Sequence, residues 1–250
     1  MSTCQSSAKF PARRKAIHRL LVVAAGLSLL GLASCQTSPR GQIPAPPATT
    51  PVPEAGAPFP GAREYRVVAE ESLLQVFAYR GGAMARLGHN HIIASHHLDG
   101  VVYVTDDLLQ TRFDVSFPVS ELTVDEPALR EQAGPDFPPS VPQSARDGTR
   151  KNLLSEAVLD AAQFPTIRLR ATDVAATATG FEVGVEITIK GQTRLVRVPV
   201  EVERSDGQLI ARGELPLKQS ELGLLPFTAA LGALVVLDDM RVRFDLTARQ

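Results

Sequence analysis

Histidines are the most concentrated side chains in this sequence that could do chemistry, and their spacing raises the question of a metal site. Four of the five lie within nine residues: His89, His91, His96 and His97. One residue separates His89 from His91, which places two side chains on the same face of a β-strand. Zinc sites of the carbonic anhydrase type take two histidines from such a strand and a third from elsewhere. A turn at residues 94–95 would bring His96 or His97 back toward this pair.

The histidine cluster has a second interpretation. Such residues can also be ordinary polar side chains at the rim of a sheet, satisfied by backbone groups or water. Asp99 is the only obvious carboxylate beside the cluster that could orient a metal-bound imidazole. We therefore expect no bound metal and no cofactor, and we keep a zinc site as the alternative.

Catalysis has little support in the sequence. No G-x-S-x-G nucleophile elbow occurs, and both cysteines lie near the N-terminus. The pairs Asp106-Asp107 and Asp238-Asp239 are adjacent residues, whose side chains point to opposite faces of a strand, so neither pair is an acid–base dyad. Gly81-Gly82 lacks the following Lys and Ser or Thr of a phosphate-binding loop. We expect a protein that is not an enzyme.

The cysteine at position 35 has a different chemistry, which the elements before it define. Residues 1–34 contain five basic and no acidic residues, followed by an apolar run from Leu20 to Leu32. This is the pattern of a secretory signal, and the run is too short for a transmembrane helix of about 20 residues. Residues 32–35, Leu-Ala-Ser-Cys, resemble the bacterial lipobox, in which the cysteine sulfur accepts a diacylglycerol. We expect a lipoprotein signal peptide over residues 1–34 and lipidation at Cys35.

Processing changes the composition of the chain. Because five basic and no acidic residues leave with the signal, the formal net charge falls from −1 to −6. An acidic domain without tryptophan is a poor nucleic-acid binder. Cys4 leaves and Cys35 is acylated, so no disulfide within the chain is predicted. Gln36, rather than Asp, follows the cysteine, which favours an exported protein on the outer membrane, facing the periplasm.

A proline-rich tether follows the expected lipid. Eight of the 19 prolines lie within residues 36–62: Pro39, Pro44, Pro46, Pro47, Pro51, Pro53, Pro58 and Pro60. Such a segment holds neither a helix nor a sheet ladder and acts as a semi-rigid spacer. At about 3.1 Å per residue it reaches at most about 80 Å. Residues 35–62 are thus the tether, and residues 63–250 are a single folded domain.

Beyond the tether, apolar and polar residues alternate with a period of two, which is typical of strands with one buried face. The clearest stretches are 113–119, 181–189, 196–202, 209–217 and 240–248. Short turns at 190–192 and 205–207 separate neighbours, so these strands are predicted to be antiparallel. Further strands are expected at 64–69, 73–79, 98–105 and 166–171.

These strands predict an all-β fold, either an antiparallel up-and-down barrel of about eight strands or a sandwich. One long insertion, residues 121–163, interrupts them. It is proline-rich as far as Pro142, and a helix is expected over residues 149–159. Long connections of this kind are usually functional or mobile, and we expect this one to cover one end of the sheet.

Four stretches in this order resemble the YceI-like family, lipocalin-like barrels associated with binding of polyisoprenoids and other lipids. They are LDAAQFPTI at 159–167, ITIKGQTR at 187–194, LKQSELG at 217–223 and VLDDMRV at 236–242. The resemblance covers residues 63–250 and implies a lipocalin-like β-barrel domain. The family's usual Phe-Phe-Asp is replaced by Val158-Leu159-Asp160, which indicates a divergent branch.

A barrel of about eight strands is either filled by its own side chains or wide enough for one small ligand. The residues leave these alternatives evenly balanced, and the resemblance favours a cavity. The side chains that we expect to line it are Phe77, Phe113, Val115, Phe117, Phe181, Val183, Val185 and Phe244. Such an apolar lining suits an alkyl or isoprenoid chain.

The sequence thus predicts a membrane-anchored lipoprotein, in the periplasm or at the cell surface, that binds an isoprenoid or similar apolar lipid without catalysis. A periplasmic zinc-binding protein that uses the cluster from His89 to His97 is the alternative. The expected partners are the lipid ligand and the membrane that holds the N-terminal anchor, with no nucleic acid. We leave a homodimer open.

Overall fold

The computed structural model describes residues 59–250. The predicted signal peptide, Cys35 and residues 35–58 of the predicted tether lie outside the described residues. The described chain starts at Phe59, whose ring lies beneath the guanidinium of Arg112, 5.3 Å from ring centroid to Cζ. No helix in residues 59–250 has the length and apolar character needed to cross a bilayer.

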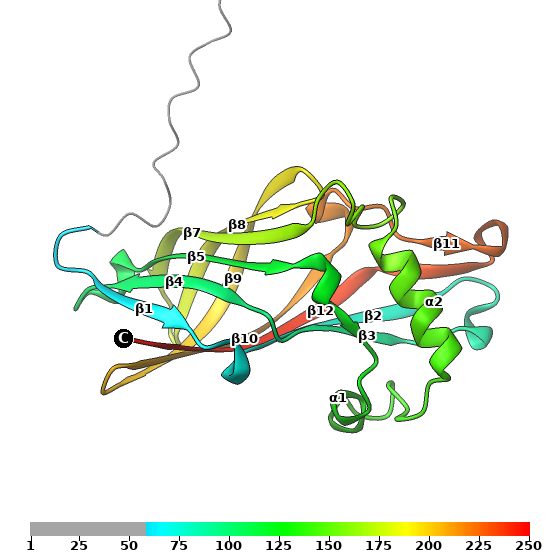
Figure 1. The fold of residues 1–250 in the computed structure, drawn as a ribbon, viewed down its shortest axis with the longest axis horizontal. Helices are drawn as coiled ribbons and strands as arrows, with labels where there is room; N and C mark the ends of the chain where they lie inside the picture. Colours follow the sequence, from blue (N-terminus) through cyan, green and yellow to red (C-terminus); the bar gives the residue numbers. More distant parts are fainter. Residues whose placement is uncertain (1–58) are drawn as a thin grey trace, which may run out of the picture. The chain divides into compact units, whose positions relative to one another are not determined.

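The described residues form twelve strands, two α-helices and six short 3-10 helices (Figure 1). The strands are β1 (Arg63–Val67), β2 (Leu73–Gly81), β3 (His91–Ser95), β4 (Asp99–Val104), β5 (Arg112–Pro118), β6 (Thr123–Val124), β7 (Thr166–Ala176), β8 (Phe181–Ile189), β9 (Gln192–Ser205), β10 (Gln208–Lys218), β11 (Thr228–Ala229) and β12 (Leu234–Arg249). The helices are α1 (Pro127–Gln132) and α2 (Gln143–Leu154), with η1 (Ala69–Glu71), η2 (Ala85–Leu87), η3 (Leu108–Gln110), η4 (Val119–Glu121), η5 (Ser220–Leu222) and η6 (Ala230–Gly232).

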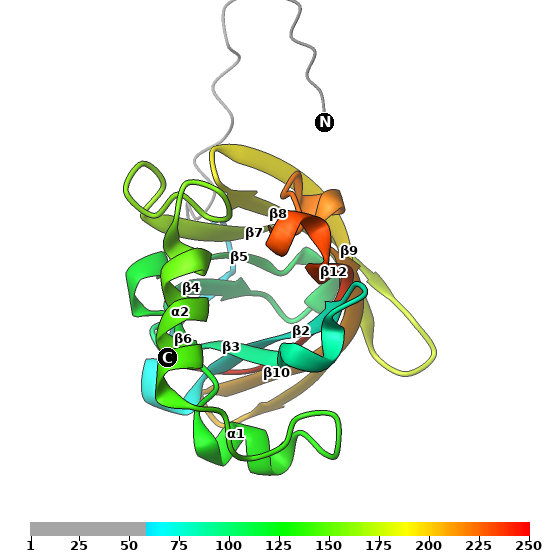
Figure 2. The same ribbon diagram turned by 90° about the vertical axis from the view of Figure 1, so that its right-hand side faces the viewer.

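Eight of the strands close into an antiparallel barrel, which confirms the predicted fold class. Their order is β1-β4-β5-β7-β8-β9-β10-β12, and β12 pairs with β1 to complete the circle. Figure 2 shows these strands arranged in a ring, with α2 beside it and α1 at its lower side. Alternation gives each strand an apolar face toward the interior and a polar face toward water, and the pairing of β12 with β1 closes the sheet.

Three walls of the barrel consist of two strands in line. The same edge of β12 pairs first with β1, at Val67 and Ala248, and then with β2, from Leu73 onward. In the same way β3 leads into β4, and η4 separates β5 from β6. The strands β2, β3 and β6 therefore extend the sheet past one end of the barrel. The breaks are five residues long between β1 and β2, three between β3 and β4, and four between β5 and β6. The sequence indicates the first of them, as the gap between the strands predicted at 64–69 and 73–79.

The break between β1 and β2 is held by a side chain. Ser72 is 3% exposed and its hydroxyl donates to the carbonyl of Val68 at 2.8 Å. The backbone N–H of Thr247 on β12 donates to the same hydroxyl at 3.1 Å. Ser72 thus supplies a hydrogen bond where the ladder is interrupted.

The long insertion has two roles. Leu129 of α1 and Phe137 pack on Phe77 and Ile92, so the first part covers the outer face of β2 and β3. After α2, Val158 and Leu159 are buried against Phe117, Ile167 and other residues at one end of the barrel. The second part is therefore the predicted cover over one end of the sheet.

Helix α2 lies earlier than the 149–159 that the sequence indicates. It begins directly after Pro142 and ends at Leu154, because the chain must then turn for Val158 and Leu159 to enter the barrel end. Gly148 lies inside α2 and lowers its helix propensity by about 1 kcal/mol relative to alanine. Tertiary contacts offset that cost, since Arg150 donates to the carbonyl of Leu122 at 3.3 Å.

Candidate ligand cavity

The barrel encloses a cavity of about 250 Å³. Thirty-one residues line it, and Thr111 is the only one among them with a polar side chain. An apolar cavity of about 150 Å³ can remain dry and bind benzene, so a larger one with this lining is suited to an apolar ligand. The interior of this barrel is hollow rather than filled by its own side chains.

Strand pairing explains why these side chains face inward. Val183 and Val185 on β8 lie opposite Val198 and Val196 on β9, and all four line the cavity. Their neighbours Glu182 and Arg197 point outward, as the period of two requires. Leu215 of β10 completes a buried cluster with Val183, Val185 and Val198.

Seven of the eight residues expected to line the barrel do so in the structure. They are Phe113, Val115, Phe117, Phe181, Val183, Val185 and Phe244. They come from three strands, β5, β8 and β12, and surround one continuous space.

Phe77 is the exception and corrects our expectation. It is fully buried, but against Ile92 and Phe137 on the outer face of β2, with a ring-centroid distance of 5.4 Å to Phe137. The guanidinium of Arg241 lies 4.3 Å from the centroid of the same ring. Both faces of β2 are apolar because the insertion covers the outer one, so alternation does not show which face is the interior.

The cavity runs the length of the barrel and its two ends differ. Lining residues at one end are buried, among them Phe117, Ile167 and Leu222, and the insertion and η5 plug this end. At the other end, beside η3, Leu108 and Thr111 are partly exposed. We therefore place the entrance at the η3 end, where the single polar lining residue lies.

Several lining residues did not enter our predicted site. Val196, Val198, Val200 and Val202 have the same alternation as the predicted residues and could have been included. Leu108 and Thr111 lie in η3 and directly after it, where no periodicity marks an inward direction. Leu222 faces the cavity from η5, outside any strand.

The structure does not bring the four histidines together. Residues 94 and 95 lie inside β3 rather than in a turn, so His96 and His97 continue away from His91. His96 Nε2 lies 2.9 Å from Oε1 of Glu126, and the rings of His89 and His91 are 6.1 Å apart. Within residues 59–250, no group of three or more His, Cys, Asp or Glu could hold a metal ion.

His91 instead belongs to a buried polar network around Asp125. Its Nδ1 donates to Oδ2 of Asp125 at 2.6 Å, while the backbone N–H of Ile92 donates to Oδ1 at 2.9 Å. Arg130, 1% exposed, also donates to Asp125 and to the carbonyl of Asn90. Burial alone would raise the pKa of Asp125, but the hydrogen bonds from His91 and Ile92 and the charge of Arg130 lower it.

The network also contacts a hydroxyl. Nε2 of His91 lies 3.2 Å from Oγ1 of Thr149, so Asp125, His91 and Thr149 are connected in the order of a hydrolytic triad. None of the three lines the cavity, however, and Asp125 is held equally by Arg130. We interpret the network as a structural contact that holds together β3, the start of the insertion and α2.

The neighbouring His89 has a lowered pKa. Burial is the main cause, and the charges of His91 and Arg130 contribute.

Comparison with known proteins gives one family. Residues 77–248 match the model of the YceI-like domain. The fold is similar to that of BcnA from Burkholderia cenocepacia, with 16% identity, a TM-score of 0.53, and coverage of 72% of this chain and 98% of BcnA. At that identity the likeness shows the fold alone.

Two further structures are more distant. A polyisoprenoid binding domain from Saccharophagus degradans, implicated in plant cell wall breakdown, has 13% identity and a TM-score of 0.47, covering 74% of this chain and 97% of that domain. The YCEI protein of Campylobacter jejuni has 11% identity and a TM-score of 0.44, covering 61% and 81% of the two chains. No curated protein matches this chain.

Proposed function

Because the chain belongs to the YceI-like domain family, we propose that its barrel binds one slender apolar lipid chain, of the isoprenoid or alkyl class, without catalysis. One observation carries the proposal, namely a continuous cavity in which Thr111 is the only polar lining residue. No charged side chain reaches that lining, so nothing in it would stabilise a polar or ionic group that had left water.

The size of the cavity restricts the ligand. Its volume of about 250 Å³ lies just below the ~300 Å³ at which pockets for drug-sized molecules begin. A single chain fits this space better than a bulky ring system. A long polyprenyl chain would be enclosed only in part, with the remainder outside the entrance.

The entrance suits the polar end of such a lipid. Thr111 and the exposed Arg112 lie there, and Asp107 caps η3 by accepting from the N–H of Leu109 at 3.0 Å. A lipid bound with its chain inside the barrel would leave its head group among these polar residues, where water remains available.

We further propose that the protein is held at a membrane by a lipid on Cys35. The signal-like segment before it and the spacer after it support this reading. Gln36 favours the outer membrane, so the barrel would lie in the periplasm and take up lipid there. The tether would let the domain move while keeping it near its source of ligand.

Mass spectrometry of an organic extract from the natively purified full chain tests the binding proposal. Wild type should yield about one lipid per chain. Val185→Phe should reduce this yield, because the larger ring would fill the cavity beside Val196. Leu195→Phe is the matched control, since Leu195 on the same pair of strands is exposed. If no lipid is found in the extracts of any of the three proteins, the proposal is contradicted.

A further inference from the structure

Exposed apolar side chains are concentrated at one place on the described domain. Seven large hydrophobic residues are exposed within residues 59–250, and five of them lie either in the β2–β3 loop or within residues 223–237, which include the β11–β12 hairpin. They are Met84, Leu87, Leu225, Leu231 and Leu237, which we call the apolar tip. Leu231 is 108% exposed and Leu225 is 79% exposed. Scattered surface leucines are ordinary, whereas a cluster of this kind marks an interaction site.

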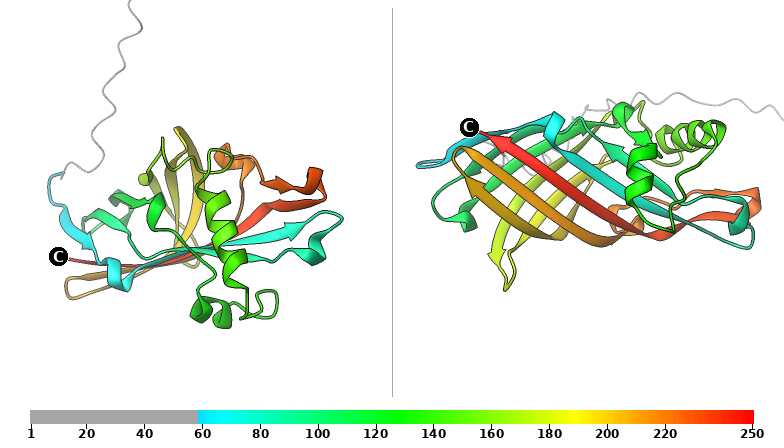
Figure 3. Two further views of the ribbon diagram at one scale, coloured as in Figure 1. Left: turned by 45° about the vertical axis from the view of Figure 1, so that its right-hand side comes forward. Right: turned by 90° about the horizontal axis from the view of Figure 1, so that it is seen from below.

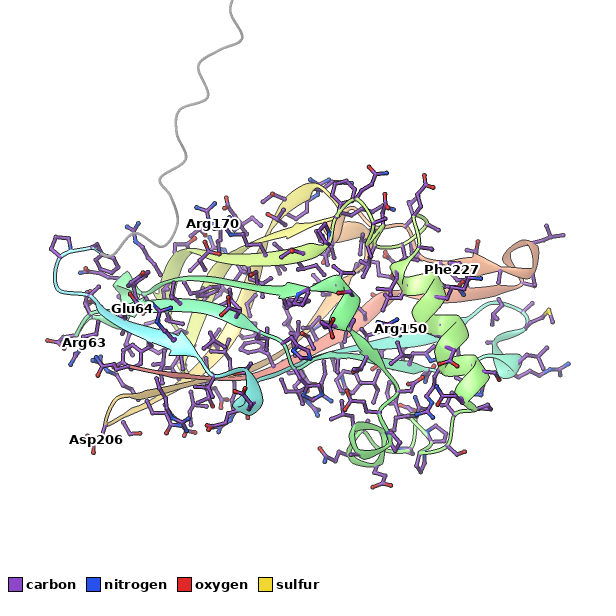
Figure 4. All side chains as sticks on the ribbon, in the orientation of Figure 1. Arg63, Glu64, Arg150, Arg170, Asp206 and Phe227 are labelled. Atoms are coloured by element: carbon purple, nitrogen blue, oxygen red, sulfur yellow. The ribbon has the colours of Figure 1, made fainter. Side chains whose placement is uncertain are left out.

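Backbone hydrogen bonds join the β2–β3 loop to the β11–β12 hairpin, so the two segments project together. The N–H of Met84 donates to the carbonyl of Ala233 at 2.8 Å, and Gly81 pairs with Val235. Both views in Figure 3 show the β2–β3 and β11–β12 hairpins side by side, extending past the barrel. The tip lies at the plugged end of the barrel, because β2 and the start of β12 continue beyond the strands that close it. Figure 4 places Phe227 at this end and Asp206 at the opposite one.

The β2–β3 loop and residues 222–237 carry charges of one sign, although Asp238, which accepts a hydrogen bond from Ser220, directly follows Leu237. Residues 72–98 and 222–237 contain no Asp or Glu, and their only permanently charged side chains are Arg80 and Arg86. Over the rest of the barrel, by contrast, arginines pair with carboxylates, as Arg212 does with Asp245 at 2.9 Å. Apolar side chains flanked by unopposed arginines are typical of segments that enter the interface of an anionic bilayer.

The backbone of the tip is strained in a way that exposes Leu231. Ala230 and Leu231 have φ of 48° and 54°, a left-handed conformation that costs non-glycine residues on the order of 1 kcal/mol each. That turn directs Leu231 into water, where it contacts nothing that would offset the cost. Strain of this kind is common where a segment is shaped for a contact.

We propose that the apolar tip inserts into the head-group region of a bilayer that contains anionic lipids. The tip presents five exposed apolar side chains, far fewer than the roughly 20–30 residues a side of a stable protein interface. A second copy of the chain is therefore a less suitable binding partner for the tip than a bilayer. The inference depends neither on lipid at Cys35 nor on the content of the cavity.

The absence of tryptophan from the sequence allows a direct test with the full chain. Leu231→Trp places a single fluorophore at the tip, and Leu195→Trp, at a position that is 57% exposed on β9, is the matched control. Each protein is mixed with vesicles of phosphatidylcholine alone or of phosphatidylcholine with phosphatidylglycerol, with and without brominated acyl chains. Because each fluorophore reports its own position, an anchor elsewhere in the chain does not obscure the result.

The emission of Leu231→Trp should shift to the blue and be quenched by brominated lipid in the anionic vesicles, and that of Leu195→Trp should not change. Adding Arg86→Gln should weaken the response about fivefold, the effect of about one unit of charge at an anionic surface. Equal responses of the two fluorophores, or no response, would overturn the proposal. So would a blue shift without vesicles that grows with protein concentration, which would identify a second copy as the occupant.

Discussion

The hydroxyl of Ser72 accepts the backbone N–H of Thr247 at 3.1 Å, although the two residues are 175 positions apart in the chain. Thr247 lies at the point on β12 where its partner changes from β1 to β2. The same hydroxyl donates to the carbonyl of Val68, so one side chain satisfies both sides of the break. This bond lets two strands share one edge of β12 without a buried, unpaired amide.

Ser72→Ala should therefore destabilise the fold by about 2 kcal/mol, the cost of leaving a buried donor without a partner. The free energy of unfolding in urea measures the change. Ser144→Ala, at an exposed position on α2, should stay within about 0.5 kcal/mol of wild type. If both variants unfold like wild type, the side chain does not hold the break.

Asp125→Asn should cost about 3 kcal/mol at neutral pH, because it leaves Arg130 as a buried charge without its partner. Asp125 has a φ of 54°, a conformation that asparagine also tolerates, so the change tests the charge rather than the backbone. Denaturant unfolding gives the value. The exposed pair of Arg212 and Asp245 supplies the control, and Asp245→Asn should cost less than about 1 kcal/mol.

The same carboxylate predicts a dependence of stability on pH. Its pKa in the folded protein lies below the ordinary value of 3.8, so the folded state favours the ionised form. This contribution is complete above the ordinary pKa and is lost as the pH falls through the folded-state pKa. The stability gap between wild type and Asp125→Asn should thus narrow from about pH 5 downward. A gap that stays constant in acid would contradict this assignment.

Val183→Asp distinguishes a cavity from a packed core. A carboxylate in the lining should abolish lipid recovery, because desolvating it costs several kcal/mol or raises its pKa. The fold should lose less stability than a packed core would, since the cavity has room for water beside the new group. Phe77→Ala gives the opposite pattern, a loss of about 3–5 kcal/mol with normal lipid recovery, because Phe77 lies outside the cavity. Thermal unfolding and lipid extraction on both variants measure the contrast.

Cys35→Ser should abolish acylation and leave the precursor unprocessed. Incorporation of labelled palmitate into wild type and variant measures the effect, with Cys4→Ser as the control that keeps its label. Equal labelling of wild type and Cys35→Ser would show that the lipid is elsewhere or absent.

The alternation of β5, β8 and β12 was sufficient to predict an antiparallel all-β fold and the inward direction of seven of the eight expected lining residues, because each of these strands has one apolar and one polar face. The choice of a barrel over a sandwich came from the family resemblance. That reasoning failed for Phe77, since the insertion makes the outer face of β2 as apolar as the inner one. In a strand that is buried on both faces, apolar and polar residues do not alternate. The sequence then does not show which face turns toward the barrel interior.

The histidines illustrate a different limit. Their spacing permits a metal site, but whether imidazoles converge depends on partners far along the chain. Asp125 and Glu126, more than 25 residues after the cluster, accept hydrogen bonds from His91 and His96 and draw them apart. Contacts between residues so far apart in the chain produce no local pattern in the sequence from which they could be predicted.

The order of the strands also has a mechanical consequence. The domain begins with β1, which is joined by four residue pairs to β4 and by two to β12, fewer than any other strand of the barrel. A force applied to the chain before Arg63 would act first on β1. It would break the hydrogen-bonded residue pairs of β1 with β4 and β12 one after another. Detachment of β1 would remove Tyr65 from its packing with Val104 and Leu209 near the entrance. The cavity would then be open to solvent between β4 and β12. Under the proposed function, tension on the anchored chain would then release the bound lipid. An optical trap that pulls on residue 59 and Gln250 should record β1 detaching at a lower force than the remaining strands.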